Sequence, residues 1–390
     1  MARLGDLFLH VRNGANIKQG LDNTGYPITR IETISNRTVN RNKMGYAGIT
    51  DVSKYSDYIL QDGDILMSHI NSEIHLGKTA LYEKKDNEII IHGMNLLSLR
   101  PNKDLIDSKY AFYYLSSQAF LRQIPNITKK SVNQASFTVS ALKELDFSLT
   151  TIEEQKKVAN DLDKLNNLIE LRTQQLSKFD KLVKSRFIEL FGVYPSNPKG
   201  WETATIRDIV ADVRYGSSRP AVDGGKYPYL RMNNITYGGE LDLTDTKRID
   251  IPDNELDKCT VRRGDVLFNR TNSKELVGKT CVYNRDEMMV LAGFVIRVRV
   301  TERVLPEFLS AFLNTDFSKQ MLLGMCKAAI GQANINAQEM QNIGIYLPPT
   351  ELQRQFVQFK KQVDKSKLAI QQSLEKLETL KKALMQQYFG

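Results

Sequence analysis

The chain repeats itself with a period close to 200 residues, which is about half of its 390 residues. Residues 63–82 read GDILMSHINSEIHLGKTALY, and residues 264–283 read GDVLFNRTNSKELVGKTCVY. Residues 133–192 align with residues 331–390 without a gap. A repeat of this length duplicates a whole module, so the sequence predicts two copies of one unit and excludes a solenoid of short repeats.

Each copy has two parts of different composition. The first part mixes β-branched runs with Gly, Asn and Asp, which predicts an α+β domain in residues 1–150 and again in 193–348. Within these domains, 88–100 and 288–300 are typical of strands, and 107–124 and 306–322 of short helices. The second part, residues 151–192 and 349–390, is rich in Leu, Lys, Glu and Gln. Its long stretches without Gly or Pro predict one long helix per copy.

Seam residues, most of them apolar, recur at steps of three and four along both long helices. This spacing is that of a coiled-coil seam, and we expect the two helices to pair antiparallel with a pseudo-twofold axis between the copies. Such symmetry suits a partner with its own twofold, either a DNA duplex or a homodimer. The seam positions are Leu162, Leu165, Ile169, Arg172, Leu176, Phe179, Val183, Arg186 and Leu190, and then Phe356, Val363, Ile370, Leu374, Leu377, Leu384 and Tyr388, where Lys360, Lys367 and Lys381 interrupt the pattern.

Helix-capping signals mark the ends of both long helices. Thr151-x-x-Glu154 and Thr350-x-x-Gln353 have the spacing of capping boxes. Gly192 and Gly390 are candidate C-terminal caps. The sequence therefore places the helix boundaries close to 151–192 and 349–390.

Motifs for catalysis are missing from both copies. The duplicated Gly-Lys-Thr at 77–79 and 278–280 lacks the first glycine of a phosphate-binding loop, because Ser72 and Ser273 stand there. The four histidines all lie in the first half, whereas a duplicated metal or catalytic site would recur. We expect Gly-Lys-Thr to close a turn between strands, and Asp64 and Asp265 to cap turns rather than to act as acids or bases.

The composition of the chain indicates its cellular compartment and the chemical class of its partner. Three cysteines without C-x-x-C spacing favour a reducing compartment and no zinc site. The sequence has no run of about 18 apolar residues and no secretory signal, so we expect a cytoplasmic chain without a membrane span. The net charge of +9 favours a polyanionic partner, although the same charge spread thinly over a large surface would mean little.

Three polar segments recur in both copies and are candidates for DNA contact. The first follows the Gly-Asp strand, where the flanking residues are the same in both copies but the polar residues at the tip of the hairpin differ. Two domains that read different half-sites would show this pattern. Ordinary sequence drift at a solvent-exposed hairpin would show it too. The second precedes each long helix and combines cations with amides. The third is the loop at Gly14 and Gly216, where the backbone permits close approach. The candidates are Ser68, His69, Asn71 and Lys78 with Asn269, Arg270, Asn272 and Lys279; Lys129, Lys130, Asn133 and Gln134 with Lys327, Gln332 and Asn334; and Arg12 and Lys18 with Arg214 and Arg219.

An ordered set of local signatures resembles the specificity subunits of bacterial and archaeal type I restriction-modification enzymes. The resemblance covers essentially the whole chain, with one departure: Leu149-Thr150-Thr151 replaces the proline pair of the second copy, so the entry into the first long helix is expected to differ. The signatures are the Gly-Asp-x-Leu segments, Phe191-Gly192 followed by Asn197-Pro198-Lys199-Gly200-Trp201-Glu202, Gly331-Gln332-Ala333-Asn334, and Leu347-Pro348-Pro349-Thr350-Glu351.

The resemblance implies a non-catalytic subunit in which two α/β target-recognition domains are separated by an antiparallel coiled coil. Such a subunit reads an asymmetric, two-part target in double-stranded DNA, one part per domain, across a spacer set by the helices. Two methyltransferase (modification) subunits with S-adenosylmethionine and restriction subunits with a translocating ATPase would dock on it, in a prokaryotic cytoplasm and at the nucleoid. This chain would then hold no cofactor or metal, since S-adenosylmethionine, ATP and Mg would belong to its partners.

Two alternatives stay open at this point. One is a DNA-recognition subunit of a related type II modification system. The other is a coiled-coil interaction protein without DNA specificity.

Overall fold

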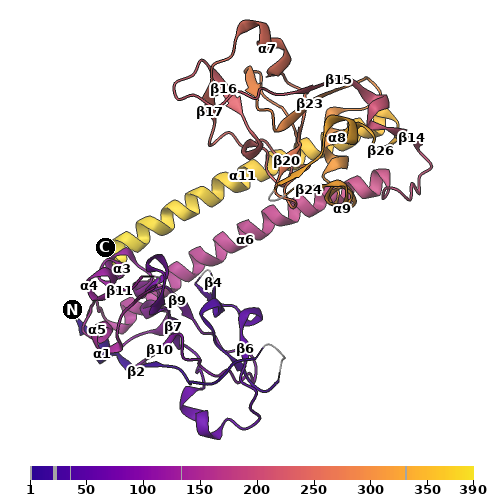
Figure 1. The fold of residues 1–390 in the computed structure, drawn as a ribbon. Coiled ribbons are helices and arrows are strands. Elements are labelled where there is room, and N and C mark those ends of the chain that lie inside the picture. Colours follow the sequence, from indigo (N-terminus) through magenta and orange to yellow (C-terminus); the bar gives the residue numbers. More distant parts are fainter. Residues whose placement is uncertain (1, 21–23, 36, 133, 330–331) are drawn as a thin grey trace. The chain divides into compact units, whose positions relative to one another are not determined.

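The computed structural model describes residues 2–20, 24–35, 37–132, 134–329 and 332–390, and it divides into two compact units (Figure 1). Unit 1 comprises residues 1–172 and 373–390, and unit 2 comprises residues 173–372. Asn133 and Gly331, which the sequence analysis singled out, lie outside the described residues. Each unit therefore combines one α+β domain with part of each long helix.

Unit 1 holds short strands and short helices, as its Gly- and Asn-punctuated sequence predicts. Its strands are β1 (Ala2–Arg3), β2 (Phe8–Asn13), β3 (Pro27–Ile28), β4 (Ile34–Ser35), β5 (Thr38–Val39), β6 (Gly45–Tyr46), β7 (Ile65–Met67), β8 (Ile70–Asn71), β9 (Thr79–Leu81), β10 (Leu97–Pro101), β11 (Lys129–Lys130), β12 (Ala135–Ser136) and β13 (Asp146–Phe147). Its α-helices are α1 (Leu4–Leu7), α2 (Ser108–Leu115), α3 (Gln118–Leu121), α4 (Ile124–Ile127) and α5 (Val139–Lys143), with the 3-10 turns η1 (Ile31–Thr33), η2 (Arg41–Lys43), η3 (Ser53–Tyr58) and η4 (Glu73–His75).

A six-stranded sheet in the order β2-β10-β7-β9-β5-β4 forms the centre of unit 1. Every residue of β7 is buried, because this apolar strand follows the Gly-Asp turn directly into the core. A buried cluster that includes Leu99, Tyr114 and Phe147 joins the sheet to α2 and to Leu162 of the long helix. Two candidate segments meet in a separate three-stranded sheet, β11-β12-β8.

Unit 2 repeats this plan with longer strands. Its strands are β14 (Glu202–Thr205), β15 (Val210–Tyr215), β16 (Tyr227–Leu230), β17 (Lys247–Ile249), β18 (Thr260–Val261), β19 (Val266–Asn269), β20 (Thr271–Asn272), β21 (Thr280–Val282), β22 (Met289–Leu291), β23 (Val295–Val300), β24 (Lys327–Ala329), β25 (Gln332–Asn334) and β26 (Gly344–Leu347). Its short helices are α7 (Asp253–Cys259), α8 (Pro306–Leu313), α9 (Asp316–Met325) and α10 (Ala337–Gln341), with the 3-10 turns η5 (Ile206–Ile209) and η6 (Met232–Asn234).

The sheets of unit 2 correspond to those of unit 1. The order β15-β23-β19-β21 matches β2-β10-β7-β9, and β20-β25-β24 matches β8-β12-β11. A further sheet, β17-β16-β22-β18, is specific to unit 2 among the described residues. The predicted strand at 288–300 is present as β22 and β23, whereas in 88–100 only β10 forms and residues 88–96 make isolated bridges at Ile91.

The two long helices are α6 (Ile152–Phe191) and α11 (Thr350–Phe389). In unit 2, the rings of Phe187 and Phe356 lie 5.3 Å apart, and Lys367 Nζ donates to Asp180 Oδ1 at 2.8 Å. In these two contacts the residue number decreases along α6, from 187 to 180, while it increases along α11, from 356 to 367. The two helices therefore run antiparallel. The predicted seam positions are buried or half-buried in both helices, including Lys360, Lys367 and Lys381, so the predicted coiled coil is confirmed.

The entries of the two long helices differ from the prediction in one respect. Thr151 caps α6, since its Oγ1 accepts from Glu154 N at 3.3 Å. Thr350 is instead the first residue of α11, and the side chain of Gln353 serves another purpose: its Oε1 accepts from Leu305 N, and its Nε2 donates to the carbonyls of Arg303 and Pro348. At the far end, Gly192 has φ +85°, as a left-handed cap requires.

The same glutamine is present in the first copy. Gln155 is fully buried, its Oε1 accepts from Asp107 N at 2.8 Å, and its Nε2 donates to the carbonyls of Leu105 and Thr150. In both copies, one buried amide therefore ties the first turn of the long helix to the loop that precedes α2 or α8. This pair of glutamines fixes each α+β domain to its own long helix.

Candidate nucleic-acid interface

The duplicated Gly-Asp turn is held by the same contacts in both units. Asp64 Oδ2 accepts from Gln61 N at 2.8 Å, and Asp265 Oδ2 accepts from Arg262 N at 2.9 Å, so the predicted turn-capping role is confirmed. Each aspartate also pairs with an arginine of the adjacent strand, Arg100 in β10 or Arg299 in β23. The two aspartates are buried structural groups.

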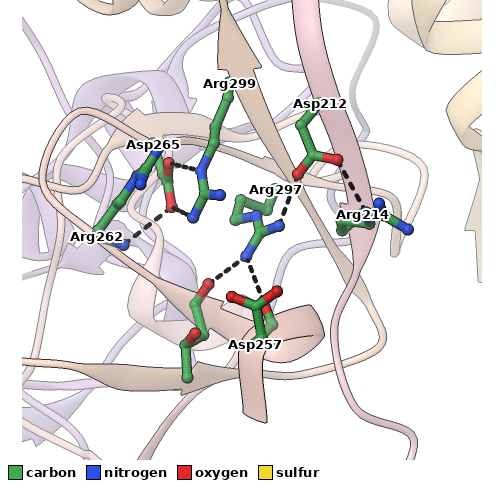
Figure 2. Close-up of polar contacts among 8 residues, drawn as sticks. Asp212, Arg214, Asp257, Arg262, Asp265, Arg297 and Arg299 are labelled. Atoms are coloured by element: carbon green, nitrogen blue, oxygen red, sulfur yellow. Dashed lines mark hydrogen bonds and ion pairs between the residues drawn. The ribbon is translucent and has the colours of Figure 1, made fainter. Parts of the chain in front are cut away.

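A second ion-pair network is specific to unit 2, and Figure 2 shows it beside the Arg299–Asp265 pair. Asp212 Oδ2 accepts from the buried Arg297 at 2.7 Å, and its Oδ1 accepts from Arg214 at 2.8 Å. Arg297 also donates to the carbonyls of Asp257 and Thr260. Burial opposes ionisation of Asp212, but the two arginines outweigh it and hold the pKa of this carboxyl below its usual range.

The backbone after the Gly-Asp strand follows the same path in both copies. Ser68 N donates to Lys78 O at 2.9 Å, and Asn269 N donates to Lys279 O at 2.8 Å. Gly77 and Gly278 have φ of +70° and +77°, the conformation that turns the chain between β7 and β9 and between β19 and β21. The expectation that Gly-Lys-Thr closes a turn is confirmed.

The three-stranded sheets bring two of the three candidate segments together. In unit 1, Asn71 of β8 lies opposite Ala135 of β12, and in unit 2, Asn272 of β20 lies opposite Ala333 of β25. The hairpin tip and the segment before the long helix, far apart in the sequence, thus form one surface in each unit. In the third candidate segment, Arg12 belongs to β2 and Arg214 to β15.

In unit 2, Arg270 is at the centre of the described polar surface. Its Nη2 donates to Asn334 Oδ1 at 3.2 Å, and its Cζ lies 4.8 Å from the ring centroid of Tyr215. Arg214 and Arg219 are exposed, and each pairs with a carboxylate, Asp212 and Glu255 respectively. Of these three arginines, Arg270 is therefore the one that is half-buried and has no carboxylate partner among the described residues.

The other candidates of unit 2 differ in accessibility. Asn269 is fully buried, and its Oδ1 accepts from Thr271 N. Lys279 is also buried, and its Nζ donates to Met232 O at 2.9 Å while burial lowers its pKa. Asn272 is half-buried and Gln332 is exposed, both in the three-stranded sheet. Lys327 begins β24, and its side chain lies outside what the structure describes.

In unit 1, the equivalent tip carries less charge. Ser68 and His69 are buried, and the ring of His69 meets that of Phe137 edge to face at 6.3 Å. Burial lowers the pKa of His69 to about 4, so this histidine is neutral near pH 7. Asn71 is half-buried, and its Nδ2 lies 3.5 Å from Ser68 Oγ.

The candidate cations of unit 1 differ in exposure. Lys129, Lys130 and Gln134 are exposed on or beside β11, and Lys130 pairs with Glu73 at 2.7 Å. Lys78 and Lys18 are also exposed. Arg12 is half-buried, with its guanidinium 5.3 Å from the ring centroid of Tyr58. The two units thus present different chemistry on one backbone frame.

Sequence reasoning missed two aromatic residues beside Arg270. Tyr215 and Phe294 are 44% and 49% exposed. Phe294 lies in the turn between β22 and β23 and was included in a predicted continuous strand. The glycine at 293 was the signal for a turn there.

Within the described ranges, no group of three or more His, Cys, Asp or Glu is arranged to bind a metal ion. Nor does any helix of those ranges have the length and apolar character that a bilayer crossing needs.

Comparison with known proteins identifies the family to which this chain, with its duplicated α+β domain and long helix, belongs. The type I restriction modification DNA specificity domain matches residues 1–179 and 198–381. This chain belongs to the type I restriction-modification specificity family. The predicted identity and role are confirmed: it is the DNA-specificity subunit of such an enzyme, and catalysis and cofactor binding are functions of the other subunits.

Relatives of this specificity subunit come from archaea and bacteria. The putative type I restriction enzyme MjaX specificity subunit of Methanocaldococcus jannaschii is 32% identical over 405 residues, covering 98% of this chain and 90% of the relative. The EcoKI specificity subunit of Escherichia coli is 23% identical over 280 residues, covering 66% of this chain and 59% of the relative.

Solved structures share the fold. The S subunit of a type I restriction-modification system from M. genitalium matches with a TM-score of 0.59 at 15% identity, covering 100% of this chain and 95% of that one. A chain from a structure of type I restriction-modification complex assembly matches with a TM-score of 0.58 at 18% identity, covering 100% and 96%. The fold of two β-rich domains with paired long helices is therefore that of an S subunit.

Proposed function

We propose that this specificity subunit reads an asymmetric, two-part sequence in double-stranded DNA, one part with residues 1–150 and the other with residues 193–348. The observation that carries the proposal is one backbone frame with different side chains. Phe137 N donates to His69 O, and Ile335 N donates to Arg270 O, so the two tips are equivalent in the backbone. The first tip carries a buried neutral imidazole and the second a half-buried guanidinium, so the second tip offers a cationic donor that the first lacks, and the two surfaces would favour different bases.

The proposal divides the candidate residues by role. Exposed lysines such as Lys129 and Lys78 suit phosphate contacts, which supply affinity without sequence information. Asn71 and Asn272 lie in the three-stranded sheets, Arg270 directly precedes β20, and all three suit contacts with base edges. The buried Asn269 and Lys279 support the turn from inside.

We also propose that α6 and α11 set the length of the unread spacer between the two half-sites. Their seam is continuous within each unit, and Gln155 and Gln353 fix the start of each helix to its own domain. With each domain anchored in this way, loop motion alone would not separate a domain from the start of its own helix.

The partners follow from the family. Modification subunits with S-adenosylmethionine and restriction subunits with an ATP-driven translocase would assemble on this chain, in the cytoplasm of a prokaryotic cell. Among the solved structures, one matching chain comes from work on assembly of a type I system, which supports this expectation.

Methylome sequencing tests the proposal. Cells that express the modification subunits with this chain should carry a bipartite adenine-methylated motif, and the motif should disappear when the chain is removed. A motif that persists without the chain, or a methylated sequence without two separated parts, contradicts the proposal.

A further inference from the structure

Arg270 lies in a socket that three distant segments of unit 2 build around it. Its backbone N–H donates to Phe294 O at 2.9 Å, and its Nη1 lies 3.5 Å from Gly293 O. Its Nη2 donates to Asn334 Oδ1 at 3.2 Å, and the ring of Tyr215 stacks below the guanidinium. The side chain is therefore held in one orientation by contacts from β15, β25 and the turn before β23.

Tyr215 is itself fixed by a bond to the next element. Its hydroxyl accepts from Ala337 N at 2.9 Å, in the first turn of α10. Because one end of the ring is anchored, its face stays below the guanidinium, where a cation–π contact favours the charged group. Tyr215 is thus arranged to position Arg270 rather than only to fill space.

A count of the donors of Arg270 shows what remains available. A guanidinium has five N–H groups. Nε is buried and has no hydrogen-bond partner among the described residues, and Nη1 and Nη2 each make one of the two bonds above. One N–H on each of the two terminal nitrogens is left without a partner among the described residues.

The charge of Arg270 is also uncompensated within the described residues, in contrast to that of three exposed arginines of unit 2. Arg214, Arg219 and Arg263 each pair with a carboxylate at 2.7–2.8 Å. No carboxylate of the described residues pairs with Arg270. Two donors on neighbouring nitrogens of one uncompensated cation match two adjacent acceptors on a ligand, and the exposed ring of Tyr215 offers apolar surface beside them.

We infer that Arg270 recognises a guanine in the half-site read by residues 193–348, and that Tyr215 and Asn334 are positioning residues that aim its two terminal nitrogens at O6 and N7. In the major groove, O6 and N7 are the adjacent acceptor pair of guanine. The inference rests on the proposed function, because it assigns one base contact within it. In unit 1, His69 stands in the place of Arg270 and Asn13 in the place of Tyr215, so the same recognition is not built there.

Guanines that lack N7 provide the decisive test. The complex of this chain with its modification subunits is bound to duplexes that carry the methylated motif, with each guanine of the second half-site replaced in turn by 7-deazaguanine. At one position the wild-type complex should lose about 5- to 150-fold in affinity. Arg270→Ala should lose a similar factor on natural DNA and show no further loss on the modified duplex.

Several outcomes overturn the inference. It fails if no guanine of that half-site is sensitive, or if Arg270→Ala is as sensitive to the modified base as the wild type. It also fails if Arg270→Ala weakens all sequences equally, since this indicates a phosphate contact. Failure of the proposed function is distinguishable, because the wild-type complex would then methylate no bipartite motif.

The role of Tyr215 needs a measurement that a structural defect would not reproduce. Tyr215→Leu removes the ring below Arg270 and should reduce discrimination against other bases at the sensitive position by about 5-fold or more, while recognition of the first half-site is unchanged. Tyr215→Phe keeps the ring and should keep most of the discrimination. Arg263→Ala is the matched control, because it removes an exposed arginine of the same unit and should leave base preference unaltered. Equal discrimination by the wild type and Tyr215→Leu overturns the positioning role.

Discussion

Arg299 donates from Nε and Nη2 to the two carboxylate oxygens of Asp265, at 2.8 and 3.3 Å. The first copy repeats this pair with Arg100 and Asp64, where both distances are 2.8 Å. In each case the aspartate also caps the turn before the central buried strand. The pair therefore couples the turn, the central strand and its neighbour, and both domains keep it.

Asp265→Ala should lower the free energy of unfolding of unit 2 by about 3 kcal/mol. The substitution leaves a partly buried guanidinium without its partner, and breaking a buried pair costs about 3–5 kcal/mol; the low end applies because Arg299 retains some exposure. Urea unfolding followed by the fluorescence of Trp201, the single tryptophan, measures the change. Asp286→Ala, which removes an exposed partner of Arg263, is the control and should change little. Equal effects of the two substitutions would show that burial is not decisive.

Gln353→Ala should loosen the start of α11. The substitution leaves Leu305 N and the carbonyls of Arg303 and Pro348 without their partner, and each unsatisfied buried group costs about 1–3 kcal/mol. Hydrogen exchange of the first turns of α11 should rise. Gln358→Ala, at an exposed position of the same helix, should leave exchange unchanged. If both variants exchange like the wild type, the glutamine is not an anchor.

Unit 1 should lose stability in mild acid before unit 2 does. Burial lowers the pKa of His10 to about 4, with Arg12 and Arg100 adding to the effect, and burial lowers the pKa of His69 to about 4 and of His92 to about 3. In the unfolded chain these groups titrate near pH 6.5, so the unfolded state binds more protons between about pH 6.5 and 4. The free energy of unfolding of unit 1 should therefore fall as the pH falls through this window.

Peptide-resolved urea unfolding between pH 7 and 5 measures this difference. All four histidines lie in the first half of the chain, so unit 2 is an internal control. His92→Leu, which introduces the residue that occupies the equivalent place at Leu291, should flatten the pH profile of unit 1. Parallel profiles for the two units would contradict the prediction.

Lengthening both long helices should change the spacer. Seven residues inserted after Arg172 and after Gln372 keep the seam in phase and add about 10 Å, or about three base pairs of DNA. The methylated motif should then keep both half-sites with a different separation, or methylation should cease. Replacement of residues 173–179 by the inserted heptad keeps the length and is the control. Full methylation at the original spacing would refute the role of the helices as a spacer.

Lys129→Ala should weaken DNA binding without altering sequence preference. Lys129 is exposed in β11, and a lysine that contacts phosphate contributes about one unit to the slope of log affinity against log salt concentration. Affinity titrations over a range of salt concentrations should show a shallower slope for the variant. Lys103→Ala, an exposed lysine after β10 outside the candidate segments, should keep the wild-type slope. A changed methylation motif would mean that Lys129 reads bases.

Local sequence patterns predicted the long helices, the turns and their caps. They did not predict which residues are exposed on the candidate DNA-binding surface. The seam of α6 and α11, the Gly-Lys-Thr turn and the caps at Asp64 and Asp265 each depend on residues close in sequence, and all were predictable. Lys279 and Asn269 looked like polar tips but are buried, since neighbouring segments cover them. Tyr215 and Phe294 were not among the candidates, and both are exposed.

The sequence by itself determined that this protein is one module written twice, with an α+β domain and a long helix in each copy, because periodicity and turn residues act over short distances. It also indicated candidate residues for DNA contact, but not which of these candidates are accessible at the surface. Only the tertiary structure decided that, because the accessibility of Arg270 depends on Tyr215, Phe294 and Asn334, which approach it from three separate strands and turns. Contacts between segments that are far apart in the chain do not produce a periodic pattern in the sequence, so the sequence alone does not reveal them.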